Sequence, residues 1–157
     1  MIRILVTALT IFVLDQASKY YVMQVLDLPM TRVIDIASPY LTFVMAWNTG
    51  INFGLFGDAD MKWLLIALSI VVSVALFFWA RSKPGKTQFW TGLIIGGALG
   101  NAVDRWLYGA VADFLNMSCC GIDNPYVFNV ADIAIFAGAA GLILLPGTTP
   151  RKRRKAA

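Results

Sequence analysis

The chain has 157 residues, of which 59% are hydrophobic and only 14% are charged, and its mean hydropathy is +0.70. These values lie far outside the range of water-soluble domains, so the composition excludes an ordinary soluble enzyme or binding module and predicts an integral membrane protein. The formal net charge is +4, and the chain contains no histidine.

Four apolar segments are each close to the ~20 residues that a helix needs to cross about 30 Å of hydrocarbon. They cover residues 2–23, 63–80, 89–107 and 127–145. We therefore expect an all-α integral membrane fold, in which a single domain over residues 1–157 forms a bundle of four transmembrane helices.

The first span carries a polar stripe toward its C-terminal end. Asp15, Ser18 and Lys19 are three and four residues apart, so they share one side of the helix. Charged groups are costly at membrane depth. We expect Asp15 and Lys19 to neutralise each other or to contact lipid headgroups rather than to react.

The connection between the first two spans is too long for a hairpin. Residues 33–36 and 40–47 are rich in β-branched and aromatic side chains, which predicts a small external β-rich segment lying on the membrane. Glycines separate apolar residues over 48–57. We expect a short interfacial helix there that aims Asn48.

The third span combines packing glycines with a polar end. Glycines recur every four residues over 92–100, the spacing that allows close helix approach in lipid. Asn101, Asp104 and Arg105 then share one side of the last turns. We expect Asp104 to brace Arg105, whose guanidinium offers a fork of donors to peptide carbonyls.

Two further aspartates stand beside the third and fourth apolar segments. Asp113 follows the third segment, and Asp132 lies three residues after Asn129 at the start of the fourth. Acids beside polar partners at membrane depth favour a functional site, so we interpret Asp113 and Asp132 as a catalytic pair. The alternative is an exposed loop acid and an acid that the dipole favours at a helix N-terminus.

Lys and Arg residues gather in three connections. They are Arg3, the group Arg81, Lys83 and Lys86, and the basic tail over residues 151–157. Since basic residues mark cytoplasmic loops, both termini are expected in the cytoplasm and the acid-rich connections outside. We expect the tail to anchor to anionic lipid, with no role in nucleic-acid binding.

Short motifs occur in a fixed order along the chain. They are Asp15-Gln16-Ala17-Ser18-Lys19, Asn48-Thr49-Gly50 with Phe53-Gly54, Gly100-Asn101 with Asp104-Arg105, Gly109 and Val111 with Asp113-Phe114, and Phe128-Asn129-Val130-Ala131-Asp132 with Gly138. Their order and spacing, and the four predicted spans, resemble the bacterial lipoprotein signal peptidases (signal peptidase II). Ile51, Asn52 and Ile133 depart from the usual family pattern.

The resemblance implies an aspartyl protease of the bacterial inner membrane. Such a hydrolase removes the signal peptide from diacylglyceryl-modified prolipoproteins, just before the lipid-modified cysteine. The resemblance places the catalytic role on Asp113 and Asp132. It implies supporting or substrate-binding roles for Asp15, Lys19, Asn48, Gly50, Asn101, Asp104, Arg105 and Asn129.

The residue inventory favours the same chemistry. With no histidine and two cysteines the chain lacks ligands for a metal site, and no serine stands beside a plausible base. Two carboxylates held close share one proton, so one can take a proton from water while the other polarises a peptide carbonyl. We expect a monomer that needs no cofactor and whose partners are prolipoproteins and membrane lipid.

Two other functions remain open from the residues alone. The first is a small four-helix proton-coupled transporter or channel subunit, although the acids lie toward the external ends and the chain shows no inverted repeat. The second is a structural membrane chaperone, which would leave the polar constellation unexplained.

Overall fold

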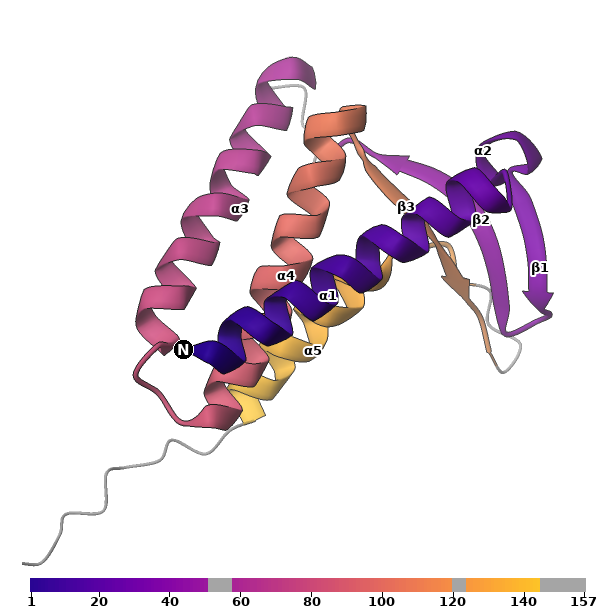
Figure 1. Cartoon of the computed structure of the whole chain (residues 1–157). Coiled ribbons are helices and arrows are strands. Elements are labelled where there is room, and N and C mark those ends of the chain that lie inside the picture. Colours follow the sequence, from indigo (N-terminus) through magenta and orange to yellow (C-terminus); the bar gives the residue numbers. More distant parts are fainter. Residues whose placement is uncertain (51–57, 120–123, 145–157) are drawn as a thin grey trace, which may run out of the picture.

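Helix α4, Gly85–Tyr108, is central to the fold because α1, α3 and α5 all pack against it. The computed structural model describes residues 1–50, 58–119 and 124–144. Helix α1 covers Ile2–Tyr20 and continues as a π-helical turn over Tyr21–Val25, α3 covers Asp58–Ala80, and α5 covers Val130–Leu144. Figure 1 shows the N-terminus, the α3–α4 connection and the end of α5 at one end of the bundle, and the sheet at the other.

The four predicted apolar segments are helical, with shifted ends. Among the described residues, one helical stretch, Met61–Ala80, is both long and apolar enough to cross a membrane, and α5 is apolar but has 15 residues. Helices α1 and α4 have 19 and 24 residues but carry charged and polar side chains. The predicted count of four transmembrane helices therefore stays a proposal.

Glycines of α4 let α1 approach closely. A Cβ atom on Gly96 would lie 2.5 Å from the backbone oxygen of Ala8 in α1. One turn later, a Cβ on Gly100 would lie 2.6 Å from Oδ2 of Asp15. Small residues at a helix contact permit this close packing. The polar stripe of α1 is consequently brought against the polar end of α4.

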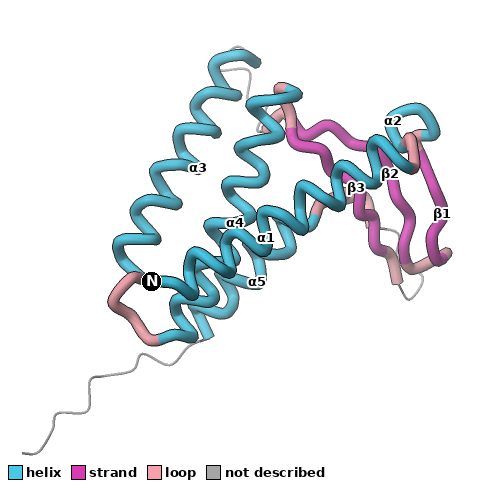
Figure 2. The backbone as a smooth tube through the Cα atoms, in the orientation of Figure 1, coloured by secondary structure: helices cyan, strands magenta, loops and turns pink. Residues whose placement is uncertain are grey.

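Three antiparallel strands form a small sheet in the order β1-β2-β3. Strands β1, Val33–Ala37, and β2, Leu41–Asn48, lie in the predicted β-rich segment, and a short helix α2, Leu28–Thr31, precedes them. Figure 2 shows β3, Val111–Met117, beside β2 although more than 60 residues separate them in sequence. The sequence did not predict β3, whose residues were expected in an external loop.

Strand β3 is buried, unlike a typical edge strand. Its outer edge is covered by Phe128, whose backbone nitrogen donates to the oxygen of Leu115 at 3.0 Å and whose oxygen accepts from Phe114 at 3.0 Å. Val22 and Met45 pack with Phe114 in the apolar cluster beneath the sheet. Burial on both sides makes β3 a rigid support for the side chain of Asp113.

Two predicted features lie outside the described residues. The interfacial helix expected over 48–57 falls mostly on residues 51–57, and the basic tail begins after residue 144. Asn48 itself is the last residue of β2.

Candidate active site

Strand pairing brings Asn48 to Asp113. Asp113 pairs with Ala46 across β2 and β3, and Asn48 lies two positions further along β2, so it points to the same face. The Nδ2 atom of Asn48 donates to Oδ2 of Asp113 at 3.1 Å. Asp113 is 3% exposed. The acid expected in a loop is thus a buried strand residue.

Gly50 sets the direction of the Asn48 amide. The backbone N–H of Gly50 donates to Oδ1 of Asn48 at 3.0 Å, which leaves the NH₂ group for Asp113. The φ angle of Gly50 is 104°, a conformation that residues with a Cβ rarely adopt. Gly50 therefore orients the Asn48 amide, which donates a hydrogen bond to the candidate catalytic acid Asp113.

Asp132 is held at the start of α5 by a reciprocal capping arrangement with Asn129. Oδ1 of Asn129 accepts from the backbone N–H of Asp132 at 2.9 Å, and Oδ2 of Asp132 accepts from the backbone N–H of Asn129 at 3.3 Å. These bonds satisfy two donors that a helix N-terminus leaves open. Asp132 is half-buried, and its other carboxylate oxygen faces Asn101.

Asn129 also links the two acids. Its Nδ2 atom donates to Oδ1 of Asp113 at 2.6 Å and to Oδ1 of Asn101 at 3.1 Å. Asn101 in turn donates from Nδ2 to Oδ1 of Asp132 at 2.9 Å. Hydrogen bonds through two buried amides thus connect the carboxylates of Asp113 and Asp132.

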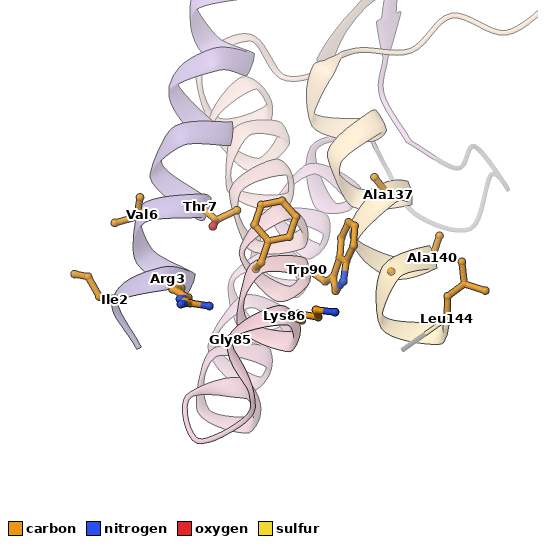
Figure 3. Close-up of a pocket in the computed structure, with 12 residues that line it drawn as sticks. Ile2, Arg3, Val6, Thr7, Gly85, Lys86, Trp90, Ala137, Ala140 and Leu144 are labelled. Atoms are coloured by element: carbon orange, nitrogen blue, oxygen red, sulfur yellow. The ribbon is translucent and has the colours of Figure 1, made fainter. Parts of the chain in front are cut away.

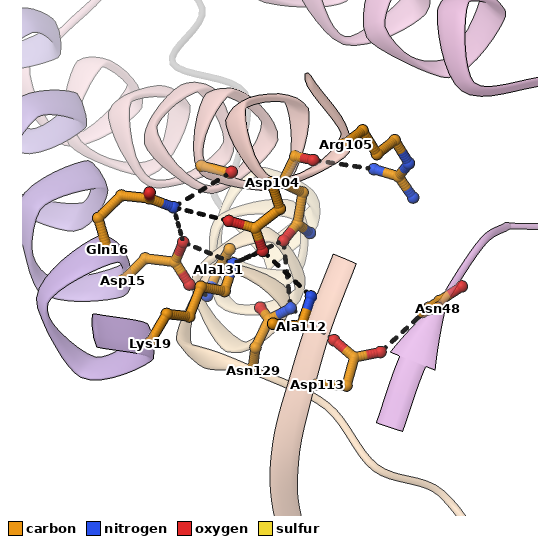
Figure 4. Close-up of polar contacts among 12 residues, drawn as sticks. Asp15, Gln16, Lys19, Asn48, Asp104, Arg105, Ala112, Asp113, Asn129 and Ala131 are labelled. Atoms are coloured by element: carbon orange, nitrogen blue, oxygen red, sulfur yellow. Dashed lines mark hydrogen bonds and ion pairs between the residues drawn. The ribbon is translucent and has the colours of Figure 1, made fainter. Parts of the chain in front are cut away.

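Lys19 contacts one of these amides, that of Asn101, and belongs to a buried charge cluster (Figure 4). Its Nζ atom lies 2.8 Å from Oδ2 of Asp15 and 2.7 Å from Oδ2 of Asp104. It also donates to Oδ1 of Asn101 at 3.2 Å. An ammonium group can only donate, so it holds the Asn101 oxygen toward itself and the Asn101 NH₂ group toward Asp132.

The contacts of Asp104 differ from the sequence prediction. Asp104 was expected to brace Arg105, but it pairs with Lys19 and accepts from the backbone N–H of Ala112 at 3.2 Å. Gln16 donates to Oδ1 of Asp104 at 3.0 Å. The side chain of Asp104 faces α1 and the start of β3 because helix rotation places it on the packed side of α4, and it is 1% exposed.

Two contributors to the site were missed from the sequence. Gln16 also donates to Oδ2 of Asp15 at 3.2 Å, and the backbone N–H of Ala131 donates to Oδ1 of Asp15 at 2.9 Å. The i,i+4 spacing of Asp15 and Lys19 and the motifs shared with the family indicated other members of this cluster, but neither indicated a role for Gln16 or the backbone of Ala131. Asp15 therefore joins α1 to the first turn of α5, which carries Asp132.

The side chain of Arg105 makes one hydrogen bond to the residues that the structure describes. Its Nη1 atom donates to the backbone oxygen of Asn101 at 3.3 Å. The buried Nε atom has no hydrogen-bond partner among the described residues. Asp113, Asp132 and Asp104 are the acids whose charges act on the Arg105 guanidinium. The guanidinium thus lies within electrostatic reach of both candidate catalytic acids.

Burial raises the pKa of Asp113 to about 6, and the charge of Asp132 adds to this effect. Hydrogen bonds from Asn48 and Asn129 oppose it, as does the more distant charge of Lys19. Asp113 therefore keeps its proton in weakly acidic solution. A protonated carboxyl beside a second acid is the arrangement that general acid–base hydrolysis requires.

The raised pKa predicts how stability depends on pH. Below about pH 4 Asp113 is protonated in both the folded and unfolded states, so it has no effect; between pH 4 and 6 only the unfolded state ionises, and stability is lost. Asp113→Asn should remove this loss. The free energy of unfolding of the variant should therefore exceed that of the wild type at pH 7 by up to about 3 kcal/mol. Thermal unfolding in detergent from pH 4 to 7 measures the difference. A wild type that becomes more stable than Asp113→Asn as the pH rises would contradict this prediction.

A cavity of about 840 Å³ opens beside the acids. Asn48, Asp113 and Asp132 form its polar part, whereas Phe128, Ile133 and Phe136 give it an apolar wall. Pockets for apolar ligands commonly combine such walls with a few polar groups. The arrangement suits hydrolysis of a polar bond in a largely apolar molecule.

The chain is similar to bacterial lipoprotein signal peptidases. The sequence model of the family described as Signal peptidase (SPase) II matches residues 7–146. A lipoprotein signal peptidase of Methylorubrum extorquens is 45% identical over 143 residues, covering 89% of this chain and 82% of that protein. A lipoprotein signal peptidase of Rhodopseudomonas palustris strain CGA009 is 44% identical, covering 83% of each.

The fold is also similar to that of a solved bacterial membrane enzyme. One structure of such an enzyme, obtained in meso at 1.9 Å resolution, has a TM-score of 0.76 and 24% identity, and the match covers 89% of both chains. A second one, at 2.3 Å, has a TM-score of 0.75 over 98% of this chain. These likenesses show that the helices and the small sheet form an established membrane-enzyme fold.

Proposed function

Because the chain belongs to the signal peptidase II family, we propose that it is an aspartyl endopeptidase that cleaves diacylglyceryl-modified prolipoproteins just before the modified cysteine. The observation that carries the proposal is the position of Asp113 and Asp132. Both line one cavity, and Asn129 is hydrogen-bonded to both residues. Membership of the family makes the chain a protease that acts in signal peptide processing.

The two acids have different environments, which suggests different roles. Asp113 is buried and holds its proton to about pH 6, so it is the member that donates a hydrogen bond to the scissile carbonyl. Asp132 stands in the first turn of α5, where the helix dipole favours negative charge, so it takes a proton from the attacking water. Asp132, which then carries the proton from the water, donates it to the leaving nitrogen as the C–N bond breaks and the carbonyl forms again.

Amides and Arg105 supply the fixed donors around the reaction. Asn48, Asn101 and Asn129 hold the carboxylates in place through the bonds described above. Donors that are ordered before the substrate arrives lower the cost of reorganisation during the reaction. Arg105 remains available for a carbonyl of the substrate peptide.

The proposed membrane arrangement follows from charge. We place helices α1, α3, α4 and α5 across the bacterial inner membrane with both termini in the cytoplasm. The basic residues Arg3, Arg81 and Lys86 lie at the N-terminus and in or next to the α3–α4 connection, which are at the same end of the bundle. The sheet and the two acids then lie toward the external face. A lipid-modified cysteine would meet them near the boundary between the inner membrane and the water on its external face.

A cleavage assay tests this function. The purified full-length protein in detergent is mixed with a diacylglyceryl-modified prolipoprotein, and mass spectrometry identifies the new N-terminus. We expect cleavage just before the modified cysteine and no cleavage of the unmodified precursor. Intact modified precursor, or cleavage at another bond, would reject the proposal.

Arg105 provides a sharper test of the substrate path. Arg105→Lys keeps the charge but loses the planar fork of donors, so we expect kcat/KM to fall by tenfold or more, or about 1.4 kcal/mol per decade. Lys62→Arg, a swap between the same residue types on α3, should leave the rate unchanged. Wild-type kinetics in Arg105→Lys would make Arg105 an anchor at the membrane boundary.

A further inference from the structure

A second cavity, of about 850 Å³, lies between α1, α4 and α5 at the end opposite the sheet. Val6, Phe89, Trp90 and Leu144 are among the apolar side chains that line it. Figure 3 shows Trp90 between α4 and α5 with Arg3 and Lys86 nearby. The proposed peptidase chemistry gives this cavity no role.

Two cations stand on the wall of this cavity. Arg3 and Lys86 both line it, from the first turns of α1 and α4. The Arg3 guanidinium lies directly over Gly85, so close that a Cβ atom there would collide with it. The amino group of Met1 donates to Gln88 in the same turns of α4, at 3.1 Å.

No acidic residue from the lining segments offsets this charge. Residues 1–14, 61–103 and 133–144 contain no aspartate or glutamate. The nearest acid along α1, Asp15, is 12 residues beyond Arg3, about 18 Å at 1.5 Å per residue. The start of α4 adds its own partial positive charge, and Pro84 provides no side-chain cap. The cavity is therefore apolar inside and uniformly cationic at its mouth.

We propose that this cavity binds one anionic glycerophospholipid of the inner leaflet. The phosphate lies between Arg3 and Lys86, and an acyl chain lies along Trp90 and Ala137. Basic residues beside an apolar groove are complementary to an anionic headgroup with its chain. The proposal goes beyond the peptidase function and does not depend on the catalytic acids.

The main competing occupant is the signal peptide. The cavity adjoins the active-site cavity, because Ala137 and Ala140 line both. A signal peptide is apolar like an acyl chain, but it begins with a positively charged region. Arg3 and Lys86 would repel that region, whereas they attract a phosphate. Charge thus favours the lipid.

Native mass spectrometry of the delipidated full-length protein measures the preference. The protein in neutral detergent is titrated with phosphatidylglycerol or with phosphatidylcholine of identical chains. We expect one phosphatidylglycerol to bind about tenfold more tightly than phosphatidylcholine, since two cations contribute. Arg3→Gln/Lys86→Gln should reduce this preference to within about twofold. Equal affinities in the wild type would overturn the proposal.

The matched control removes the same charge from the same end. Arg81 and Lys83 lie over the rings of Phe78 and Trp79 and do not line the cavity. Arg81→Gln/Lys83→Gln should therefore keep the tenfold preference. An equal loss in both double variants would show general surface attraction and overturn the site.

Fluorescence locates the acyl chain without charge variants. Phosphatidylglycerol with brominated chains should quench the wild type more than Trp90→Phe, because bromine quenches the tryptophan that it contacts. Equal quenching would exclude the chain from the cavity. Recovery of Trp90 emission on adding an apolar peptide with a lysine-rich N-terminus would assign the cavity to signal peptides instead.

Discussion

Asp113→Asn and Asp132→Asn should each lower kcat for prolipoprotein cleavage by at least about 10³-fold, because each removes one half of a shared acid–base pair. Both substitutions keep the size of the side chain. The double variant should lose no more than about tenfold beyond either single variant, since groups that act as one unit give non-additive losses. Single-turnover cleavage in detergent measures all three rates.

A matched control for these variants is Asp35→Asn. Asp35 lies in the exposed strand β1 and accepts a hydrogen bond from Thr42 at 2.9 Å, away from both catalytic candidates. It should keep wild-type activity. The inactive variants should still bind a lipopeptide with the wild-type Kd. Losses that simply multiply in the double variant would reject the shared-proton mechanism and favour a proton-carrying transporter.

Among the variants proposed for this protein, Lys19→Met should lose the most stability. Lys19 is 3% exposed and is the cation between Asp15 and Asp104, which are 0% and 1% exposed. Removing one partner from a buried ion cluster leaves charge uncompensated, which costs about 3–5 kcal/mol. Thermal unfolding in detergent measures the loss. Activity should fall as well, because the Asn101 amide loses the contact that orients it toward Asp132.

The surface variant Lys83→Met provides the comparison. Lys83 is exposed, so its loss should change stability by no more than about 0.5 kcal/mol. Lys19→Met/Asp104→Asn should regain part of the stability, because it removes one of the two unpaired carboxylates. A melting temperature of Lys19→Met equal to that of Lys83→Met would show that water or protonation already compensates the cluster.

The same two amides contact the candidate catalytic acids and the buried groups that stabilise the fold. Asn101 contacts Lys19 on one side and Asp132 on the other, and Asn129 caps α5 while it contacts Asp113. A change at either amide therefore alters both the orientation of an acid and the packing of two helices. Measurements of activity on such variants need a parallel measurement of unfolding.

Local pattern was sufficient for much of the helical fold. Apolar run length located α1, α3, α4 and α5, and the recurring glycines of α4 predicted its close contact with a neighbouring helix. Asp15 and Lys19 were paired correctly from their spacing, because residues four apart on a helix are neighbours. Each of these features depends on residues close in sequence.

Strand β3 depended instead on contacts between distant residues. Its seven residues have no strong alternating pattern, and the strand forms because β2 on one edge and Phe128 on the other satisfy its backbone. The sequence therefore placed Asp113 in an external connection after the third apolar segment, whereas pairing with Ala46 buries it in a strand beside Asn48. Its raised pKa follows from that burial.

The sequence by itself determined which residues are polar in an apolar chain, where the long helices run, and which family the motifs resemble. Only the tertiary structure decided that Asp104 meets Lys19 instead of Arg105, and that Asn129 joins the two candidate catalytic acids. Helical spacing shows which side chains share a face, but not which neighbour that face meets. That choice depends on the rotation and close packing of α1, α4 and α5, which no local pattern encodes.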